Sequence, residues 1–219
     1  EVVAGSEDGR AYCLDGRTGV VEWSFATGGE VWNLGAVVDV DGDGRRELVF
    51  GSYDRKIYCL SSSGFLKWNY TTYPNMVGYC LPSGVPTVTD VDGDGKMEVI
   101  IGSDKIWCLN SAGVLKWAYN LHVPAGDSCN VADINGDGKK EIVFGACDSN
   151  TWCLNATGGY LWQYRTGDDV RTSPAIADAN ADGRMEVIIG SVDGKAYCLN
   201  GTGKLVWSYE TGYPILGSS

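Results

Sequence analysis

Four short acidic segments have the residues and the spacing to bind a metal ion. Each follows the pattern Asp-x-Asp/Asn-x-Asp-Gly-x-x-Glu, so oxygen-bearing side chains recur at positions 1, 3, 5 and 9. Ca²⁺ is bound by hard oxygen ligands, and its loops use a glycine at position 6 for the sharp bend and a backbone carbonyl at position 7. The pattern therefore predicts four calcium sites. The side-chain ligands would be Asp39, Asp41, Asp43, Glu47, Asp90, Asp92, Asp94, Glu98, Asp133, Asn135, Asp137, Glu141, Asp178, Asn180, Asp182 and Glu186, with the backbone carbonyls of Arg45, Lys96, Lys139 and Arg184.

The pattern excludes an EF-hand and leaves one alternative to a metal site. In an EF-hand the glutamate falls at position 12 between helices, whereas here it falls at position 9 and strand-like sequences flank the loop. Mg²⁺ fits less well, because flexible oxygen ligands suit the larger ion. The chain has a formal charge of −11, and bound Ca²⁺ would relieve the repulsion among its carboxylates. The alternative is four solvated Asp/Asn-Gly turns without metal.

A fivefold repeat positions these loops. An aromatic-Cys-Leu tripeptide recurs with its cysteine at residues 13, 59, 108, 153 and 198, and each is followed by Gly-x-x-x-Trp. Each unit contains short stretches with the two-residue alternation of β-structure, and no stretch has helical periodicity. We predict an all-β, five-bladed β-propeller of four-stranded antiparallel blades. The single domain would span residues 1–219, in repeat units of approximately 1–34, 35–82, 83–127, 128–171 and 172–219.

The strand pattern also suggests how the ring closes. In the second unit we expect strands at 35–40, 47–52, 56–61 and 65–71, ordered from the propeller axis outward. The first unit begins at the end of an acidic loop and lacks its innermost strand. We expect residues 213–219 to supply that strand by pairing with residues 1–6. The alternative is that the chain is a fragment of a larger propeller.

Two known repeats resemble this unit. The acidic loop followed by an apolar strand ending in Gly-Ser resembles the calcium-binding FG-GAP (VCBS) repeats of integrin α-type propellers. The Tyr/Trp-Cys-Leu segment followed by Gly-x-x-x-Trp resembles the tryptophan-docking repeat of PQQ-like quinoproteins. This second resemblance implies that the tryptophans lie between neighbouring blades: Trp23, Trp68, Trp117, Trp162 and Trp207. The quinone cofactor is not carried over, because the chain has five units rather than eight and no adjacent pair of cysteines.

Other residues give little sign of catalysis. His122 is the only histidine, which removes most nucleophile-histidine arrangements, so we expect no enzyme activity. The five repeat cysteines are expected to be buried apolar residues. Among Cys80, Cys129 and Cys147 we expect one disulfide and one free thiol. The negative charge argues against nucleic acid as a partner, and no apolar run has the length of a transmembrane helix.

A candidate ligand site follows from positions that vary between units. Positions that agree between blades serve the fold, so varying positions in the connections between blades are free for recognition. Trp32 is the one tryptophan without a repeat role, and an exposed aromatic beside polar groups suits a sugar ring or a partner protein. The alternative is that these are ordinary loop residues. The candidate ligand-binding residues are Trp32, Asn33, Tyr79, Asp127, Arg171 and Thr172.

The sequence thus predicts a calcium-stabilised β-propeller binding module, extracellular or at the cell surface, with a function in adhesion or carbohydrate recognition. Its partner would be a glycan or a surface protein, with no direct membrane insertion. The alternative is a structural scaffold of a surface or extracellular assembly that self-assembles. A quinoprotein-like enzyme is the least favoured of the three.

Overall fold

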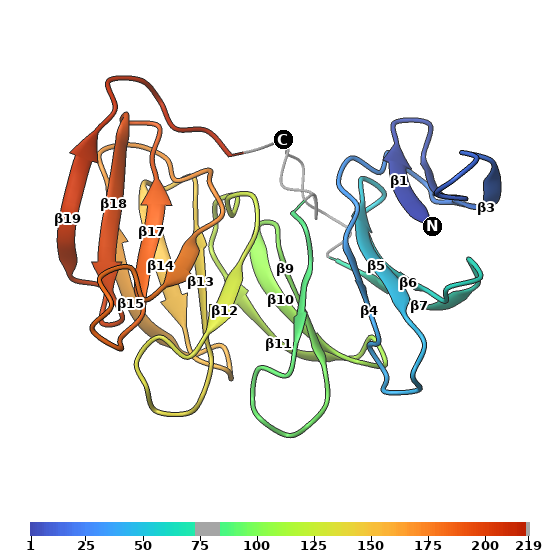
Figure 1. Cartoon of the computed structure of the whole chain (residues 1–219), viewed down its shortest axis with the longest axis horizontal. Helices are drawn as coiled ribbons and strands as arrows, with labels where there is room; N and C mark the ends of the chain where they lie inside the picture. Colours follow the sequence, from blue (N-terminus) through green and yellow to red (C-terminus); the bar gives the residue numbers. More distant parts are fainter. Residues whose placement is uncertain (73–83, 218–219) are drawn as a thin grey trace.

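The computed structural model describes residues 1–72 and 84–217, which form nineteen strands in five antiparallel sheets (Figure 1). We call the sheets blades 1 to 5 in chain order. Blade 1 has three strands, β1 (Val2–Ser6), β2 (Arg10–Leu14) and β3 (Val21–Ala26). Within these two ranges there is no helix of the length and apolarity that a membrane crossing requires.

Blades 2 to 5 repeat one up-and-down order of four strands, starting from the short inner strand. Blade 2 contains β4 (Ala36–Val38), β5 (Glu47–Ser52), β6 (Lys56–Leu60) and β7 (Leu66–Thr71). Blade 3 contains β8 (Thr87–Thr89), β9 (Glu98–Gly102), β10 (Lys105–Asn110) and β11 (Leu115–Asn120). Blade 4 contains β12 (Asn130–Ala132), β13 (Glu141–Gly145), β14 (Asn150–Leu154) and β15 (Tyr160–Arg165). Blade 5 contains β16 (Ala175–Ala177), β17 (Glu186–Gly190), β18 (Lys195–Asn200) and β19 (Leu205–Glu210).

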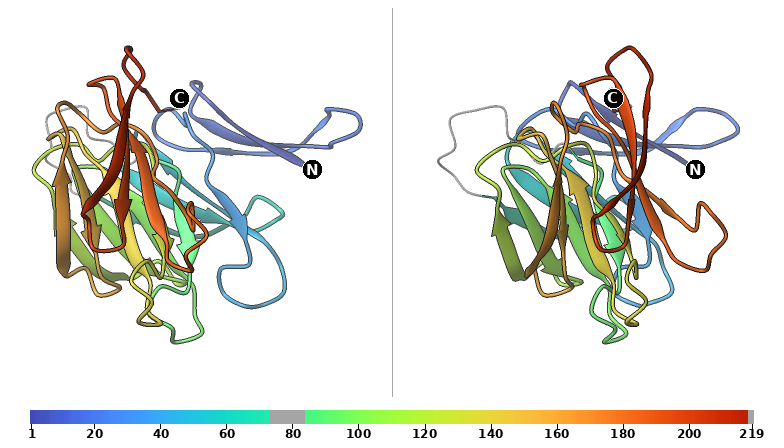
Figure 2. Two further views of the ribbon diagram at one scale, coloured as in Figure 1. Left: turned by 60° about the vertical axis from the view of Figure 1, so that its left-hand side comes forward. Right: turned by 90° about the vertical axis from the view of Figure 1, so that its left-hand side faces the viewer.

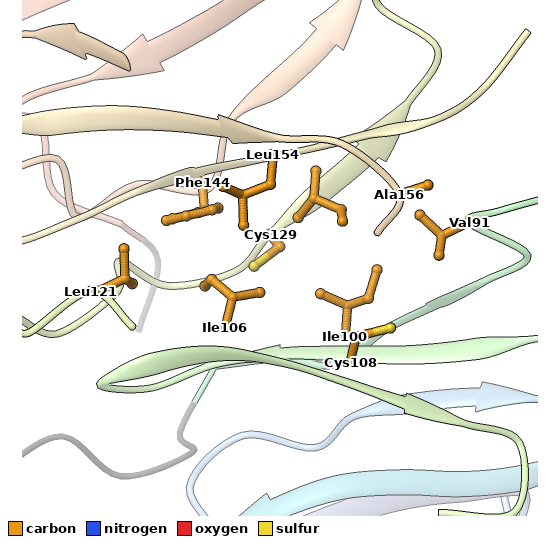
Figure 3. Close-up of a cluster of buried hydrophobic side chains, with 10 residues drawn as sticks. Val91, Ile100, Ile106, Cys108, Leu121, Cys129, Phe144, Leu154 and Ala156 are labelled. Atoms are coloured by element: carbon orange, nitrogen blue, oxygen red, sulfur yellow. The ribbon is translucent and has the colours of Figure 1, made fainter. Parts of the chain in front are cut away.

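The core lies between the blades rather than within any one of them. The second strand of each middle blade is buried at every position, because a neighbouring blade covers each of its faces. The apolar residues form four clusters, one at each junction between successive blades. Figure 3 shows the junction of blades 3 and 4, where Ile106 and Cys129 face Phe144 and Leu154. Stacking of neighbours is therefore what stabilises each unit.

A tryptophan locks each of these four junctions. The indole Nε1 of Trp117 donates a hydrogen bond to the carbonyl of Ala156 in the next blade, at 3.1 Å. Its ring covers Gly158, where a Cβ atom would lie 2.7 Å from the indole and where φ is +79°. Only glycine satisfies both the close approach and the left-handed backbone. The same arrangement is made by Trp23, Trp68 and Trp162.

These observations confirm the all-β, five-bladed architecture but not the predicted closure. Strand β1 pairs only with β2, and the described residues 213–217 form no strand. Instead the Ile215 N–H donates to the Ser191 carbonyl of its own blade at 3.0 Å. Blades 1 and 5 lie at opposite ends of the row in Figure 1, and both views of Figure 2 show blade 1 projecting away from the other blades.

The structure differs from the predictions at Trp207 and bears on the predicted cysteine pairing. Trp207 was expected between blades, but it is 44% exposed, because among the described residues no sheet packs against β19 from the other side. Cys129 is a free thiol, so it does not pair with Cys147, and Cys80 lies outside the described residues. The five repeat cysteines are buried as expected. Burial raises the pKa of the Cys59 and Cys108 thiols to about 12, which keeps them unreactive.

Candidate metal centres

The four acidic loops join the first strand of blades 2 to 5 to the second strand, so all four lie along one edge of the molecule, at the bottom of Figure 1. The first aspartate shapes each loop. Asp39 accepts the N–H of Gly42 at 2.7 Å through Oδ1 and that of Gly44 at 2.8 Å through Oδ2. Gly44 has a φ of +83°, which explains the glycine at position 6. The loop is therefore folded by its own first and sixth residues.

The aspartates of the first two loops converge closely enough to share one cation. One carboxylate oxygen from each of Asp39, Asp41 and Asp43 lies within 4.8 Å of the other two. The second loop brings its three aspartates together within the same limit. Ca²⁺ binds oxygen at about 2.3–2.6 Å, so two ligands on opposite sides of one ion lie about 5 Å apart. The residues present therefore fit a calcium ion.

The glutamate at position 9 has a different place in the loop. Glu47 is 1% exposed, and its Oε2 accepts the N–H of Val40 at 2.9 Å. Glu98, Glu141 and Glu186 make the same bond to the residue at position 2 of their loops, at 3.0–3.1 Å. This bond ties the loop to the start of the second strand. The groups of three carboxylates that lie close enough to share one ion contain only aspartates. The glutamate instead accepts a backbone hydrogen bond at the base of the loop.

Two lysines form ion pairs with carboxylates of the first two loops. The sequence analysis did not single out these lysines. The Nζ of Lys67, on the outer strand β7, lies 2.7 Å from Asp41 and 2.8 Å from Glu47. Lys116 on β11 makes the equivalent contacts with Asp92 and Glu98, at 2.6 and 3.0 Å. The hydrogen bond from Lys67 lowers the pKa of Asp41. Each lysine is a built-in cation bound to template carboxylates.

In the other two loops the glutamate at position 9 accepts a hydrogen bond from an asparagine amide instead of a lysine. Asn135 donates from Nδ2 to Oε1 of Glu141 at 3.0 Å, and Asn180 donates to Asp182 at 3.1 Å and to Glu186 at 3.5 Å. In these blades the residue before the docking tryptophan is Leu161 or Val206 instead of lysine. Aspartate at position 3 thus occurs with lysine, and asparagine without it. This co-variation between repeats is visible in the sequence and could have identified the lysines.

The predicted ligand residues fall into two groups on the connections opposite the acidic loops. Trp32 is 56% exposed and stacks on Tyr53, with ring centroids 5.3 Å apart, while its Nε1 donates to Glu30. Asn33 follows it in the same connection. Among the described residues, no hydrogen bond or ring contact joins Trp32 to Arg171.

The second group surrounds the C-terminal segment. Arg171 pairs with Asp169 at 3.0 Å, and a Cβ on Gly217 would lie 2.6 Å from the Arg171 carbonyl and 3.5 Å from the Asp127 Cβ. Burial raises the pKa of the Asp127 carboxyl. Thr172 donates to the Gly190 carbonyl at 3.0 Å, which indicates a structural contact. Tyr79 lies outside the described residues.

Comparison with solved structures shows the same fold in several proteins. The V. cholerae biofilm matrix protein Bap1 is 24% identical, with a TM-score of 0.73, over 91% of this chain and 32% of that one. BamB from Moraxella catarrhalis is 18% identical, with a TM-score of 0.72, over 100% of this chain and 63% of that one. The quinohemoprotein alcohol dehydrogenase from Comamonas testosteroni is 15% identical, with a TM-score of 0.69, over 97% and 43%. The chain therefore spans less than two thirds of the length of each of these proteins.

Sequence comparisons identify the repeat itself. A search of curated proteins finds no match. The model of the lambda-carrageenase β-propeller domain matches residues 1–66 and 174–217. The model of the FG-GAP-like repeat matches residues 39–101, 90–144 and 133–189, and each match begins at the first aspartate of an acidic loop. Because these three matches run without a break across more than half of the sequence, the chain belongs to the FG-GAP-like repeat family.

Proposed function

We propose that this protein is a calcium-stabilised β-propeller binding module that acts outside the cell or at its surface. The observation that carries the proposal is the convergence of three aspartate carboxylates within 4.8 Å in each of the first two acidic loops. Four loops of one template support it, because each repeats aspartate at positions 1 and 5, glycine at position 6 and glutamate at position 9. Carboxylates held this close repel one another, and a divalent cation removes that repulsion.

Calcium would act on the fold through the inner strands. Each acidic loop connects the short first strand of a blade to its buried second strand, and in blade 2 the Glu47–Val40 hydrogen bond closes the loop base. A cation held by Asp39, Asp41 and Asp43 would fix the upper part of the same loop. An ion that binds only the folded chain stabilises it in proportion to the logarithm of its concentration.

All four loops would present a similar charge to the cation. In the first two loops a lysine neutralises one of the four template carboxylates, and in the other two asparagine replaces that carboxylate. Counting only these groups, the net charge is the same in every loop. We therefore infer four sites of comparable electrostatic attraction rather than two strong and two weak sites.

An extracellular location fits this chemistry. Calcium sites of extracellular modules have dissociation constants of about 10⁻⁴–10⁻³ M, in keeping with loops as exposed as these. The FG-GAP-like repeat and the fold shared with a biofilm matrix protein support the same location.

The Trp32–Tyr53 pair is the proposed recognition surface, for a glycan or a surface protein. Trp32 is 56% exposed, stacks on Tyr53 and lies beside the Glu30 carboxylate, which combines stacking area with a hydrogen-bond acceptor. This surface lies on the connections opposite the acidic loops, so ligand binding and metal binding should be separable. A screen against glycans and surface proteins, with and without Ca²⁺, would identify the ligand class.

Calorimetric titration tests the metal proposal directly. Ca²⁺ added to the chelator-stripped protein should bind at four sites, and Mg²⁺ should bind more weakly. Asp94→Ala should remove or weaken one site and leave three, whereas Glu7→Ala, an exposed carboxylate outside the loops, should change nothing. Titration without a calcium-specific signal in the wild-type protein would contradict the proposal.

A further inference from the structure

The proposed recognition surface contains one carboxylate that lies near both of its aromatic rings. Glu30 accepts a hydrogen bond from the indole Nε1 of Trp32, and its backbone carbonyl accepts the N–H of Tyr53 at 2.9 Å. Burial and the nearby Glu30 carboxylate raise the pKa of the Tyr53 phenol. Glu30 is half-buried, whereas Trp32 remains exposed although Tyr53 stacks on it. A carboxylate therefore lies at the edge of an accessible ring.

The connection between β15 and β16 has the same backbone arrangement but different side chains. Counted from the first aspartate of the acidic loop that follows, Asp169 and Arg171 occupy the positions of Glu30 and Trp32. The Asp169 carbonyl accepts the N–H of Val192 at 2.9 Å, which repeats the backbone bond made by Glu30. Arg171 donates from Nη2 to the Asp169 carboxylate at 3.0 Å. In this connection the carboxylate is thus neutralised by a cation of its own chain.

The Glu30 carboxylate lacks such a cation. Among residues 1–72 and 84–217, no lysine or arginine forms an ion pair with it. The indole N–H satisfies one carboxylate oxygen but leaves the negative charge uncompensated, and a charged donor would bind this half-buried group more strongly. The face of the Trp32 ring also attracts cations, through the quadrupole of the indole. Both features favour a cation from a ligand, in the place that a guanidinium fills in the last connection.

We propose that this surface binds a glycan whose sugar rings carry a protonated amino group, with one ring stacked on Trp32 and its ammonium bound to Glu30. The inference rests on the proposed recognition surface and names its ligand class. The C–H face of a pyranose ring packs on an aromatic ring, and the ammonium beside it would form a charge-assisted hydrogen bond with the carboxylate.

The size and the charge of the site favour an amino sugar over other ligands. One exposed indole and one carboxylate match a single sugar residue, whereas a stable protein interface buries about 1,200 Å² or more. The formal charge of −11 repels glycans that carry carboxylate or sulfate groups and attracts cationic ones. The site does not include the acidic loops, so the ligand class can be tested with the calcium concentration held constant.

Calorimetric titration of the full chain with two oligosaccharides tests the proposal. The probes are a hexamer of glucosamine and a hexamer of N-acetylglucosamine, which has the same rings without the charge. In about 0.15 M NaCl, which screens long-range attraction, the glucosamine hexamer should bind at least about tenfold more tightly. Glu30→Gln keeps an acceptor for the indole N–H and should abolish this difference, whereas Trp32→Ala should weaken both probes. The matched control is Asp169→Asn, which changes the net charge equally and should alter neither affinity.

Four results would overturn the proposal. Equal affinity for both hexamers, lost in Trp32→Ala, would retain the recognition surface but exclude ammonium recognition. Tight binding of glucosamine that survives Glu30→Gln and Trp32→Ala would show general attraction to an acidic protein. A lysine hexamer that binds more tightly, with the same dependence on Glu30 and Trp32, would identify a protein segment as the ligand. If neither sugar binds, an amino-sugar glycan is excluded; the recognition surface itself fails only if Trp32→Ala also leaves every ligand found in the wider screen unaffected.

The comparison of the two hexamers needs no variant, so it tests ammonium recognition even if a substitution impairs folding. Circular dichroism of each variant checks that the fold is retained.

Discussion

The ammonium nitrogen of Lys67, on β7, lies 2.7 Å from Oδ2 of Asp41 in the acidic loop of the same blade. In blade 4 the corresponding residues are Leu161 and Asn135. The pair and the single amide do the same work, since each supplies an N–H to the buried glutamate at position 9. The buried glutamate thus receives its hydrogen bond either from a lysine paired with aspartate or from an asparagine. Exchanging the two arrangements within one blade tests whether they are equivalent.

Lys67→Leu should destabilise the protein and Asp41→Asn should rescue it. Removing the lysine leaves Oε1 of the buried Glu47 without its donor, at a cost of about 1–3 kcal/mol. Asparagine at position 41 can donate to Glu47 as Asn135 does to Glu141. Urea unfolding of the two single variants and the double variant measures the coupling. A double variant no more stable than Lys67→Leu alone would show that the two arrangements are not equivalent.

Truncating a docking tryptophan should cost more stability at a junction between two blades than in blade 5. Trp117→Ala removes a ring packed between blades 3 and 4 and should cost about 3–5 kcal/mol in the free energy of unfolding. Trp207→Ala, at the matched position of blade 5, should cost much less in dilute solution, because its ring is 44% exposed. Chemical denaturation of both proteins is the measurement. Equal losses would mean that Trp207 is covered in solution even in the monomer.

Trp32→Ala should affect recognition more than stability. The substitution removes one ring of a stacked pair, worth about 0.5–1.5 kcal/mol, from a half-exposed position. Affinity for whatever glycan or protein a screen identifies should fall, while Arg171→Ala, in the second group of residues, reports whether that group shares the site. If Trp32→Ala unfolds the protein as severely as Trp117→Ala, Trp32 belongs to the fold. If Trp32→Ala folds and binds normally, the ligand site lies elsewhere.

Tyr197 predicts a loss of stability at alkaline pH. Burial and a 2.6 Å hydrogen bond to Asp193 raise its pKa to about 12. A raised pKa means that the native state holds the phenol proton more tightly than the unfolded chain, so this contribution is complete below the ordinary pKa of 10.0 and disappears as pH rises through 12. Tyr197→Phe should flatten the decline of unfolding free energy over that range.

The matched control for this pH effect is Tyr213→Phe, because Tyr213 is 81% exposed. The pH profile of that variant should follow the wild type. Profiles that coincide for the wild type and Tyr197→Phe would show that the Tyr197–Asp193 bond contributes no pH dependence.

Much of the fold was predictable from the sequence because the repeats specify it redundantly. The expected strands at 47–52 and 65–71 agree with β5 and β7 to within one residue, since the acidic loop ends at Glu47 and a turn containing Gly64 precedes β7. Trp68 docks as predicted because a following blade supplies the Ser111 carbonyl.

The sequence could not show which distant parts of the chain pack against a given residue. Trp207 has the same local sequence as the other docking tryptophans, so periodicity predicted the same environment for it. Its exposure follows from the absence of a neighbouring sheet among the described residues and not from its own sequence. Residues 213–217 look strand-like but bond back to Ser191 of their own blade. The stacking of Trp32 on Tyr53 joins the connection between blades 1 and 2 to the turn between β5 and β6, and no local pattern encodes that contact.

Thermal unfolding with and without Ca²⁺ tests the central claim most directly. If the acidic loops bind calcium in the folded state only, the melting temperature should rise with Ca²⁺ concentration, and each site held at a hundredfold excess over its dissociation constant adds about 2.7 kcal/mol. Excess chelator should reverse the rise, and NaCl of equal ionic strength should not reproduce it. A melting temperature that is the same in saturating Ca²⁺ and in chelator would contradict calcium stabilisation of this propeller.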